Sequence, residues 1–147
     1  MLISIIVPTY NESKTIIEIL EKVKKENGKI FNLEVIVVDD GSTDSTEELL
    51  KKNDHLYDSY SKLKTNQGKG AAVKKGLSIA TGDYILFQDA DLEYNPSDYK
   101  NIFNVVKEYN PDVVIGSRFK NNEFTKVLYF FNKIGNKFLT MFFNLLF

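Results

Sequence analysis

Two aspartates separated by one residue, Asp89 and Asp91, are the side chains best suited to chemistry in this sequence. They follow the mostly apolar, β-favouring run Tyr84–Gln88, which predicts a short buried strand that carries both carboxylates to its carboxyl end. Two carboxylates this close repel each other in a partly dry site unless a cation lies between them, and oxygen ligands suit a hard divalent metal. The alternative is a solvated acidic turn that caps the next helix.

The elements that must position this pair alternate along the chain. Apolar, β-branched runs predict strands at 3–7, 33–38, 59–63, 84–88 and 112–116. Pro8 cannot donate to a ladder and is expected to end the first strand. Between the strands, helical periodicity predicts helices from Ser13 to a stop at Asn27-Gly28, over 45–52, over 71–80 and from Pro96 or Ser97 onward. This order predicts an α/β fold, a mostly parallel sheet with helices on both faces.

The inner faces of these helices follow from the same periodicity. The first helix is expected to bury Ile16, Ile19, Leu20 and Val23, and the last to turn Ile102, Val105 and Val106 inward. Ser42 or Thr43 can cap the helix predicted over 45–52, with Glu47 and Glu48 in its first turn, where the helix dipole favours acidic groups.

The loops after the predicted strands carry the polar residues of chemical interest, and open α/β sheets bind ligands at this edge. Carboxylates such as Asp39 and Glu12 accept hydrogen bonds from a base N–H or from ribose hydroxyls, and Tyr10 offers a flat, partly apolar wall. Arg118 is the single arginine among 19 basic side chains, which suggests a position that needs a fixed, bidentate cation rather than a point charge. A surface ion pair is the other explanation of Arg118.

Three common phosphate-binding motifs do not fit. The segment that begins at Gly68 has Val73 where a dinucleotide fingerprint needs a small residue, and Lys69 is followed by Gly70 where a Walker loop needs Ser or Thr. Glu93 stands where an aspartyl phosphatase motif has Thr or Val. A metal-assisted nucleotide-sugar site does fit, because a divalent cation neutralises a diphosphate and stabilises the charge that develops as it leaves.

Composition excludes several other classes. The 19 basic and 20 acidic side chains exclude gross electrostatic attraction to nucleic acid. The chain has no cysteine, so it has no disulfides and no thiolate metal site, which fits a cytoplasmic location. The amino-terminal apolar run has no basic residues before it and stops at Pro8, too short for a signal peptide. His55, the lone histidine, lies in a polar stretch and is expected at the surface.

Five segments in order resemble the motifs of family 2 glycosyltransferases with a GT-A fold: Val7–Glu12, Val37–Asp44, Asn66–Ala71, Asp89–Asp91 and Gly116–Phe119. The last two are similar to those of dolichol-phosphate mannose synthases and their bacterial polyprenyl-phosphate relatives. The resemblance implies that Asp89 and Asp91 hold Mg²⁺ or Mn²⁺ on the donor diphosphate and that Arg118 meets a phosphate, these three being the catalytic set. It implies the nucleotide-sugar-binding residues Pro8, Tyr10, Glu12, Val37, Asp39, Lys69, Asp89, Ala90, Asp91 and Arg118.

The implied reaction moves a hexose, with inversion, from a donor of the GDP-mannose or UDP-glucose type to a polyprenyl phosphate at the cytoplasmic face of a membrane. One alternative acceptor is a saccharide hydroxyl, which requires a carboxylate base that the sequence does not offer. Such synthases continue well past the Gly116–Phe119 segment, so we expect this chain to be a fragment. A second alternative is therefore a donor-binding module without turnover. A pure scaffold leaves the acidic pair unexplained.

We divide the chain into a nucleotide-sugar-binding and catalytic domain, 1–123, and a Phe- and Leu-rich segment, 124–147. Lys126, Lys133 and Lys137 interrupt that segment too often for a membrane-spanning helix. Its pattern predicts an amphipathic helix that lies in the membrane interface near the lipid acceptor, through whose Phe face copies of the chain could pair. An ordinary core helix that covers the sheet is the alternative.

Overall fold

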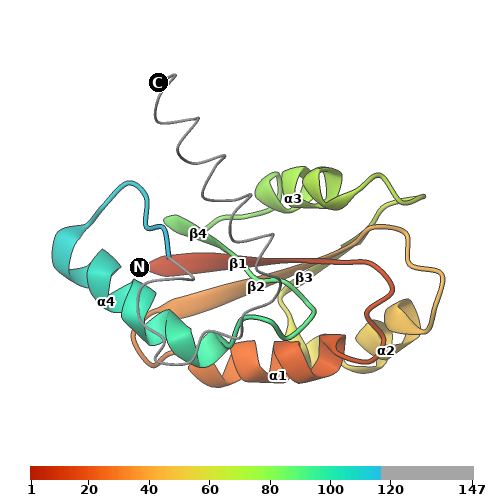
Figure 1. Ribbon diagram of the computed structural model, residues 1–147, viewed down its shortest axis with the longest axis horizontal. Helices are drawn as coiled ribbons and strands as arrows, with labels where there is room; N and C mark the ends of the chain where they lie inside the picture. Colours follow the sequence, from red (N-terminus) through yellow and green to blue (C-terminus); the bar gives the residue numbers. More distant parts are fainter. Residues whose placement is uncertain (117–147) are drawn as a thin grey trace, which may run out of the picture. The chain divides into compact units, whose positions relative to one another are not determined.

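The computed structural model describes residues 1–116, in which four strands form one parallel sheet of order β3-β2-β1-β4 (Figure 1). The strands are β1 (Leu2–Thr9), β2 (Asn32–Asp39), β3 (Ser59–Lys62) and β4 (Tyr84–Phe87). The two central strands pair from Leu2↔Asn32 to Thr9↔Asp39. The predicted parallel sheet is confirmed for this part of the chain.

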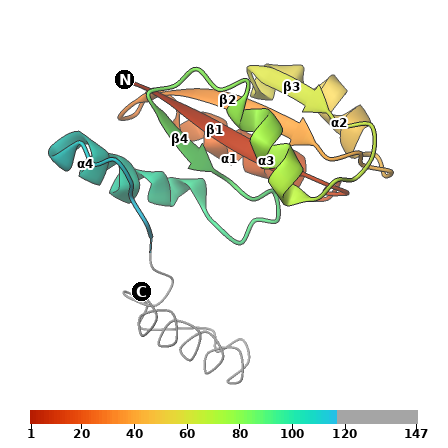
Figure 2. The ribbon, with the colours of Figure 1, turned by 90° about the horizontal axis from the view of Figure 1, so that it is seen from above.

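Helices cover both faces of the sheet (Figures 1 and 2). They are α1 (Ile16–Glu26), α2 (Thr46–Lys52), α3 (Lys69–Leu77) and α4 (Tyr99–Tyr109), with 3-10 turns at Asp54–Leu56 and Pro96–Asp98. Helix α3 lies on one face, where Ala72 packs on Ile36 and Val38. The opposite face carries the larger core, in which α1, α2 and α4 meet side chains of β1 and β2. Because helices cover both faces of the sheet, both central strands are apolar almost throughout.

Helix α1 has the inner face that its periodicity predicts. Ile16, Ile19, Leu20 and Val23 are all fully buried. The helix ends at the expected stop, where Asn27 caps it and its amide nitrogen donates to the carbonyl of Lys24. The local pattern was sufficient here because four apolar residues at helical spacing define one stripe whatever the stripe packs against.

The first strand does not end at Pro8, and that prediction was wrong. Pro8 pairs with Val38, and the strand continues to Thr9. The carbonyl of Ile6 accepts from Gln88 on the β4 side, and alternate residues of a strand face the same neighbour. The nitrogen of Pro8 therefore points toward the β4 side of the sheet, but the pairing of β1 with β4 ends at Ile6 and Phe87. No hydrogen bond between the strands is lost because Pro8 lacks an N–H.

The predicted cap of the second helix was also wrong. Helix α2 starts at Thr46 with Ser45 as its first flanking residue, and Ser42 instead accepts a hydrogen bond from the amide of Asn11, 2.9 Å away. Glu47 and Glu48 do lie in the first turn, as predicted.

Helix α4 turns Val106 and Ile102 inward, as predicted, but the prediction for Val105 was wrong. Tyr99, Phe103 and Val106 are buried and Ile102 is partly buried, whereas Val105 is 39% exposed. The buried stripe is centred on Tyr99 and Phe103, whose rings pack with centroids 5.5 Å apart, and Val105 lies outside that stripe.

Two predictions at the β4 side of the sheet were wrong. The strand was expected to be buried, but Phe87 is 52% exposed, because β4 is the last strand of the sheet in the described residues. Residues 112–116 were expected to form a fifth strand and are not in one; Val113 and Ile115 are 71% and 87% exposed. A strand needs a neighbour to satisfy its backbone groups, and alternation of apolar residues does not supply one.

In residues 1–116, no helix is long and apolar enough to cross a membrane. His55 is exposed, as predicted. Met1–Val114 form one compact unit. Segment 124–147, the domain boundary at 123 and Arg118 lie outside the described residues, so the interfacial helix and the phosphate contact stay predictions.

Candidate functional site

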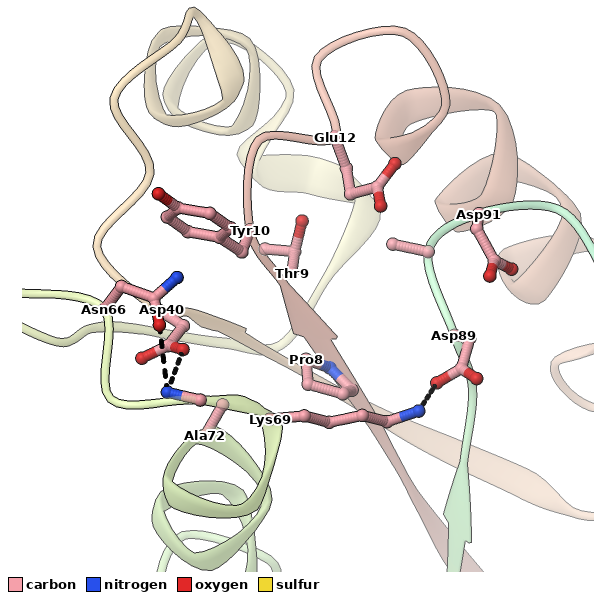
Figure 3. A pocket seen from close by; sticks show the side chains of 12 residues that line it. Pro8, Thr9, Tyr10, Glu12, Asp40, Asn66, Lys69, Ala72, Asp89 and Asp91 are labelled. Carbon is pink, nitrogen blue, oxygen red and sulfur yellow. Dashed lines mark hydrogen bonds and ion pairs between the residues drawn. The ribbon is translucent and has the colours of Figure 1, made fainter.

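A cavity of about 270 Å³ opens at the carboxyl ends of β1 and β4, next to the first turn of α3 (Figure 3). Ligands bind at this edge of open α/β sheets. The lining residues are Pro8, Thr9, Tyr10, Glu12, Asp40, Asn66, Gly68, Lys69, Ala72, Asp89, Ala90 and Asp91. Seven of the predicted site residues are thus brought together on one cavity: Pro8, Tyr10, Glu12, Lys69, Asp89, Ala90 and Asp91.

The acidic pair forms one wall of the cavity. The carboxylate of Asp89 is paired with the ammonium of Lys69, which reaches across from the start of α3 (Figure 3). The carboxylate of Asp91 accepts the amide of Glu93 at 3.0 Å, and between the two acids Ala90 is buried. A carboxylate and an ammonium therefore already face each other at this wall, and the ammonium is a group that can donate to a phosphate oxygen.

The donor set of this wall fits a divalent cation that is shared with a ligand. Mg²⁺ keeps several waters and is usually held by one or two carboxylates together with substrate phosphates, so Asp89 and Asp91 suffice. In the described part of the chain there is no group of three or more His, Cys, Asp or Glu side chains that could hold a metal on protein ligands alone. A cation here would therefore depend on the ligand for the rest of its coordination.

The end of β1 supplies the second wall. Tyr10 is 41% exposed and lines the cavity together with Thr9 and Glu12 (Figure 3). Thr9 is only 3% exposed, and its Oγ1 is the one buried side-chain polar atom without a hydrogen-bond partner among the described residues. A buried hydroxyl without a partner is costly, so a ligand toward which the side chain of Thr9 turned would relieve that cost.

The loop after β1 is held by the loop after β2. The amide of Glu12 donates to Thr46 at 3.0 Å, and the side-chain oxygen of Asn11, which has a positive φ of 55°, accepts the amide of Thr43 at 2.8 Å. Asp44 accepts from Ser13 and Thr46; although burial raises its pKa, these hydrogen bonds outweigh that effect and lower the pKa to about 2. Several motif residues thus position Tyr10 and Glu12 rather than line the cavity.

Two predicted binding residues lie elsewhere. Val37 is fully buried in the core. The carboxylate of Asp39 is also buried, and it accepts from the amide of Ser42 at 2.8 Å and from the hydroxyl of Tyr60 at 3.3 Å, with Lys62 at 3.9 Å. Neither is among the lining residues, so their contact with a nucleoside stays a prediction.

The residue next to Asp39 lines the cavity instead. The carboxylate of Asp40 accepts the amides of Gln67 and Gly68 at 2.8 and 2.7 Å, and this fixes the segment that leads into α3 (Figure 3). Sequence reasoning placed Asp40 in the right loop, and Thr9, Asn66 and Gly68 in the right motifs, but named none of them as a site residue, and it missed Ala72 entirely. Successive side chains of a strand point to opposite sides. The choice between Asp39 and Asp40 could therefore have been predicted from the sequence only if the last residue of the strand were known.

Comparison with known proteins gives a consistent result. Residues 4–144 match the family model described as glycosyl transferase family 2. The chain is 34% identical, over 82% of its own length and 41% of the relative's, to dolichyl-phosphate beta-glucosyltransferase ALG5A of Trichomonas vaginalis. The chain spans less than half the length of the curated relatives that it matches.

Solved structures agree with the sequence match. Staphylococcus aureus TarS 1-349 in complex with UDP-GlcNAc superposes with a TM-score of 0.66 at 33% identity, over 83% of this chain and 37% of that one. Mannosyltransferase PcManGT from Pyrobaculum calidifontis, in complex with GDP-Man and Mn²⁺, gives a TM-score of 0.61 at 32% identity, over 71% and 31%. With the parallel sheet described above, these likenesses confirm the expected GT-A fold.

Proposed function

We propose a function from the premise that this chain belongs to glycosyl transferase family 2. The chain binds a nucleotide-diphosphate sugar in the cavity of Figure 3 and transfers its hexose to an acceptor. The observation that carries this proposal is the wall on which Asp89, Asp91 and Lys69 meet at the carboxyl end of β4. It supplies carboxylates for a cation and an ammonium for a phosphate in one small space.

The nucleoside side of the donor is assigned to the opposite wall. Tyr10 offers a half-exposed ring as a surface for the base. The hydroxyl of Thr9 is buried without a partner in the free chain, and on donor binding it turns toward a ribose or base group. Solved relatives in complex with UDP-GlcNAc and with GDP-Man and Mn²⁺ support a donor of this class.

In the proposed reaction an acceptor oxygen attacks the anomeric carbon, the bond from that carbon to the diphosphate breaks, and the nucleoside diphosphate leaves. Asp89 and Asp91 would hold Mg²⁺ or Mn²⁺, whose chemistry is to neutralise the charge on the departing diphosphate. Lys69, on the same wall, donates to a phosphate oxygen, and its exchange of partners from Asp89 to phosphate leaves that carboxylate free for the cation.

For the acceptor we propose a polyprenyl phosphate, a partner supported by the named activity of the Trichomonas relative. Its phosphate oxygen is already anionic, so the transfer needs no general base. A hydroxyl acceptor is the second candidate, because a relative 37% identical over 117 residues is a poly(ribitol-phosphate) beta-N-acetylglucosaminyltransferase. We further propose a location at the cytoplasmic face of a membrane, where a lipid acceptor would meet the enzyme.

A thermal-shift screen tests the donor. Because a ligand that binds only the folded state raises its melting temperature, the correct nucleotide sugar at about 100 times its Kd is expected to raise Tm by roughly 5–10 °C with Mn²⁺. Without Mn²⁺ the shift should largely disappear. No shift with UDP- or GDP-linked sugars would remove the proposal. Release of nucleoside diphosphate with undecaprenyl phosphate, but not with a saccharide, would assign the acceptor.

Replacement of Thr9 with Val tests the nucleoside wall. Since the hydroxyl is buried without a partner, its removal should stabilise the free protein, by about 1 kcal/mol, and weaken donor binding about fivefold through loss of one ligand hydrogen bond. Urea unfolding and donor titration measure the two effects. Thr46→Val is the matched control, because its hydroxyl accepts from Glu12 and should therefore destabilise the protein when removed. A Thr9→Val protein that is less stable and binds donor normally would contradict the assignment.

A further inference from the structure

The loop that carries the acidic pair is closed by a buried amide. Gln88 follows β4 and is only 1% exposed. Its Nε2 donates to the carbonyl of Asp89 at 2.9 Å and to the carbonyl of Tyr94 at 3.2 Å. These two carbonyls stand at the beginning and end of the loop 89–94, so one side chain ties both ends together.

The third hydrogen bond of Gln88 connects the loop to α4. The hydroxyl of Tyr99 donates to Gln88 Oε1 at 2.7 Å, and Tyr99 is 4% exposed. Burial, and then the charge of Glu26, raise the pKa of Tyr99, so the hydroxyl keeps its proton and remains a donor. This fixes the orientation of the amide, because Oε1 must face Tyr99 and Nε2 must face the two carbonyls.

The position of Tyr99 is itself fixed by the core. Its ring packs on Phe103 at a centroid distance of 5.5 Å, and Phe103 packs on Phe31 at 5.6 Å. The main chain of Gln88 is anchored as well, since its amide donates to the carbonyl of Ile6 at 3.0 Å. Through its main chain and its side chain, Gln88 therefore connects two rigid elements, β1 and α4, to the loop 89–94.

The loop needs such support. Leu92 has a positive φ of 64°, a conformation that bulky residues rarely adopt and that persists only when its surroundings enforce it. It stands immediately after Asp91, so any relaxation of Leu92 would move that carboxylate. The acidic pair therefore owes its geometry to contacts outside the cavity.

We propose that Gln88 and Tyr99 are positioning residues, which hold the loop 89–94 so that Asp89 and Asp91 face the same cation. Neither lines the cavity. Their proposed effect is on the affinity of the acidic pair for a divalent ion, and in this respect the inference rests on the proposed function. Their effect on the backbone of the loop does not depend on the proposed function.

Tyr99→Phe removes one hydroxyl and keeps the ring in the core. We expect faster amide hydrogen exchange at residues 90–94 in the ligand-free chain, with unchanged exchange in β1, and Mn²⁺ uptake in the presence of UDP or GDP weakened about threefold to tenfold. Uptake is followed by the loss of the free Mn²⁺ signal in electron paramagnetic resonance. Tyr57→Phe is the matched control, because it removes a tyrosine hydroxyl bonded to the carbonyl of Leu50 at 3.2 Å, away from the loop.

A second variant, Gln88→Met, keeps the side-chain length and removes all three side-chain hydrogen bonds, so it should weaken Mn²⁺ uptake more than Tyr99→Phe. The double variant should be no worse than Gln88→Met alone, because the hydroxyl of Tyr99 has lost its partner already. Wild-type Mn²⁺ affinity in Tyr99→Phe, or equal losses in Tyr57→Phe, would overturn the inference. If the wild-type chain takes up no Mn²⁺ with either nucleotide, the proposed function fails, while the exchange rates still decide whether the pair holds the loop.

Discussion

Replacing Asp91 with Asn is expected to weaken Mn²⁺-dependent binding of the nucleotide sugar by roughly 100-fold, because stabilisation of the diphosphate charge by a held cation amounts to several kcal/mol. The substitution removes one of the two carboxylates and changes little else. The side-chain oxygen of Asn can still accept the amide of Glu93, the bond that Asp91 makes at 3.0 Å, so the turn should survive. Isothermal titration with donor, with and without Mn²⁺, measures the loss.

The control for this variant is Glu93→Gln, an exposed acid two residues further along the same loop. It removes the same charge from nearly the same place but from a side chain that does not line the cavity. General electrostatics would weaken binding in both variants, whereas coordination would weaken it only in Asp91→Asn. Equal donor affinity in wild type and Asp91→Asn would refute the metal assignment.

Replacing Gly41 with Ala is expected to destabilise the protein by about 3 kcal/mol and to abolish the donor-induced rise in Tm. Gly41 has a φ of +73°, and a Cβ there would lie 2.7 Å from the carbonyl carbon of Thr65 and 2.9 Å from the nitrogen of Asn66. Both contacts are with backbone, which cannot rotate away. The displaced segment is the one that Asp40 fixes at the edge of the cavity.

Gly28→Ala separates the cost of the positive φ from the cost of the close contact with backbone atoms. Gly28 has nearly the same φ, +76°, but an added Cβ would meet no atom within 4 Å. It should therefore cost only the backbone conformation, about 1 kcal/mol, and leave donor binding intact. Urea unfolding gives both free energies of unfolding by linear extrapolation. Similar losses in the two variants would mean that the close approach of Gly41 to Thr65 is unimportant.

Much of the fold followed from local pattern. The four apolar positions of α1 and the β-branched runs of β1 and β2 are properties of short segments, and each predicted its element and buried face correctly. The site edge was predictable for a related reason. In a parallel sheet all strands end on the same side, so residues that follow β1 and β4 must come together there once alternation of strand and helix is recognised.

The wrong predictions concern segments whose structure depends on a neighbouring strand or helix rather than on their own sequence. Whether Pro8 ends β1 depends on how far β4 extends beside it, and whether residues 112–116 pair depends on a partner strand. The inner face of α4 depends on what the helix packs against: Phe103 contacts Phe31 and Tyr99 and is buried, whereas Val105 is exposed.

The family, the parallel α/β sheet and the acidic pair at the end of β4 could be predicted from residue types and their order alone. Three features required the folded chain: Asp40 rather than Asp39 lines the cavity, the hydroxyl of Thr9 is buried without a partner, and Gln88 closes the loop of the acidic pair. Adjacent residues at a strand's end point to opposite sides, and hydrogen bonds of a buried side chain join segments distant in sequence. Their partners therefore exist only once the chain has folded.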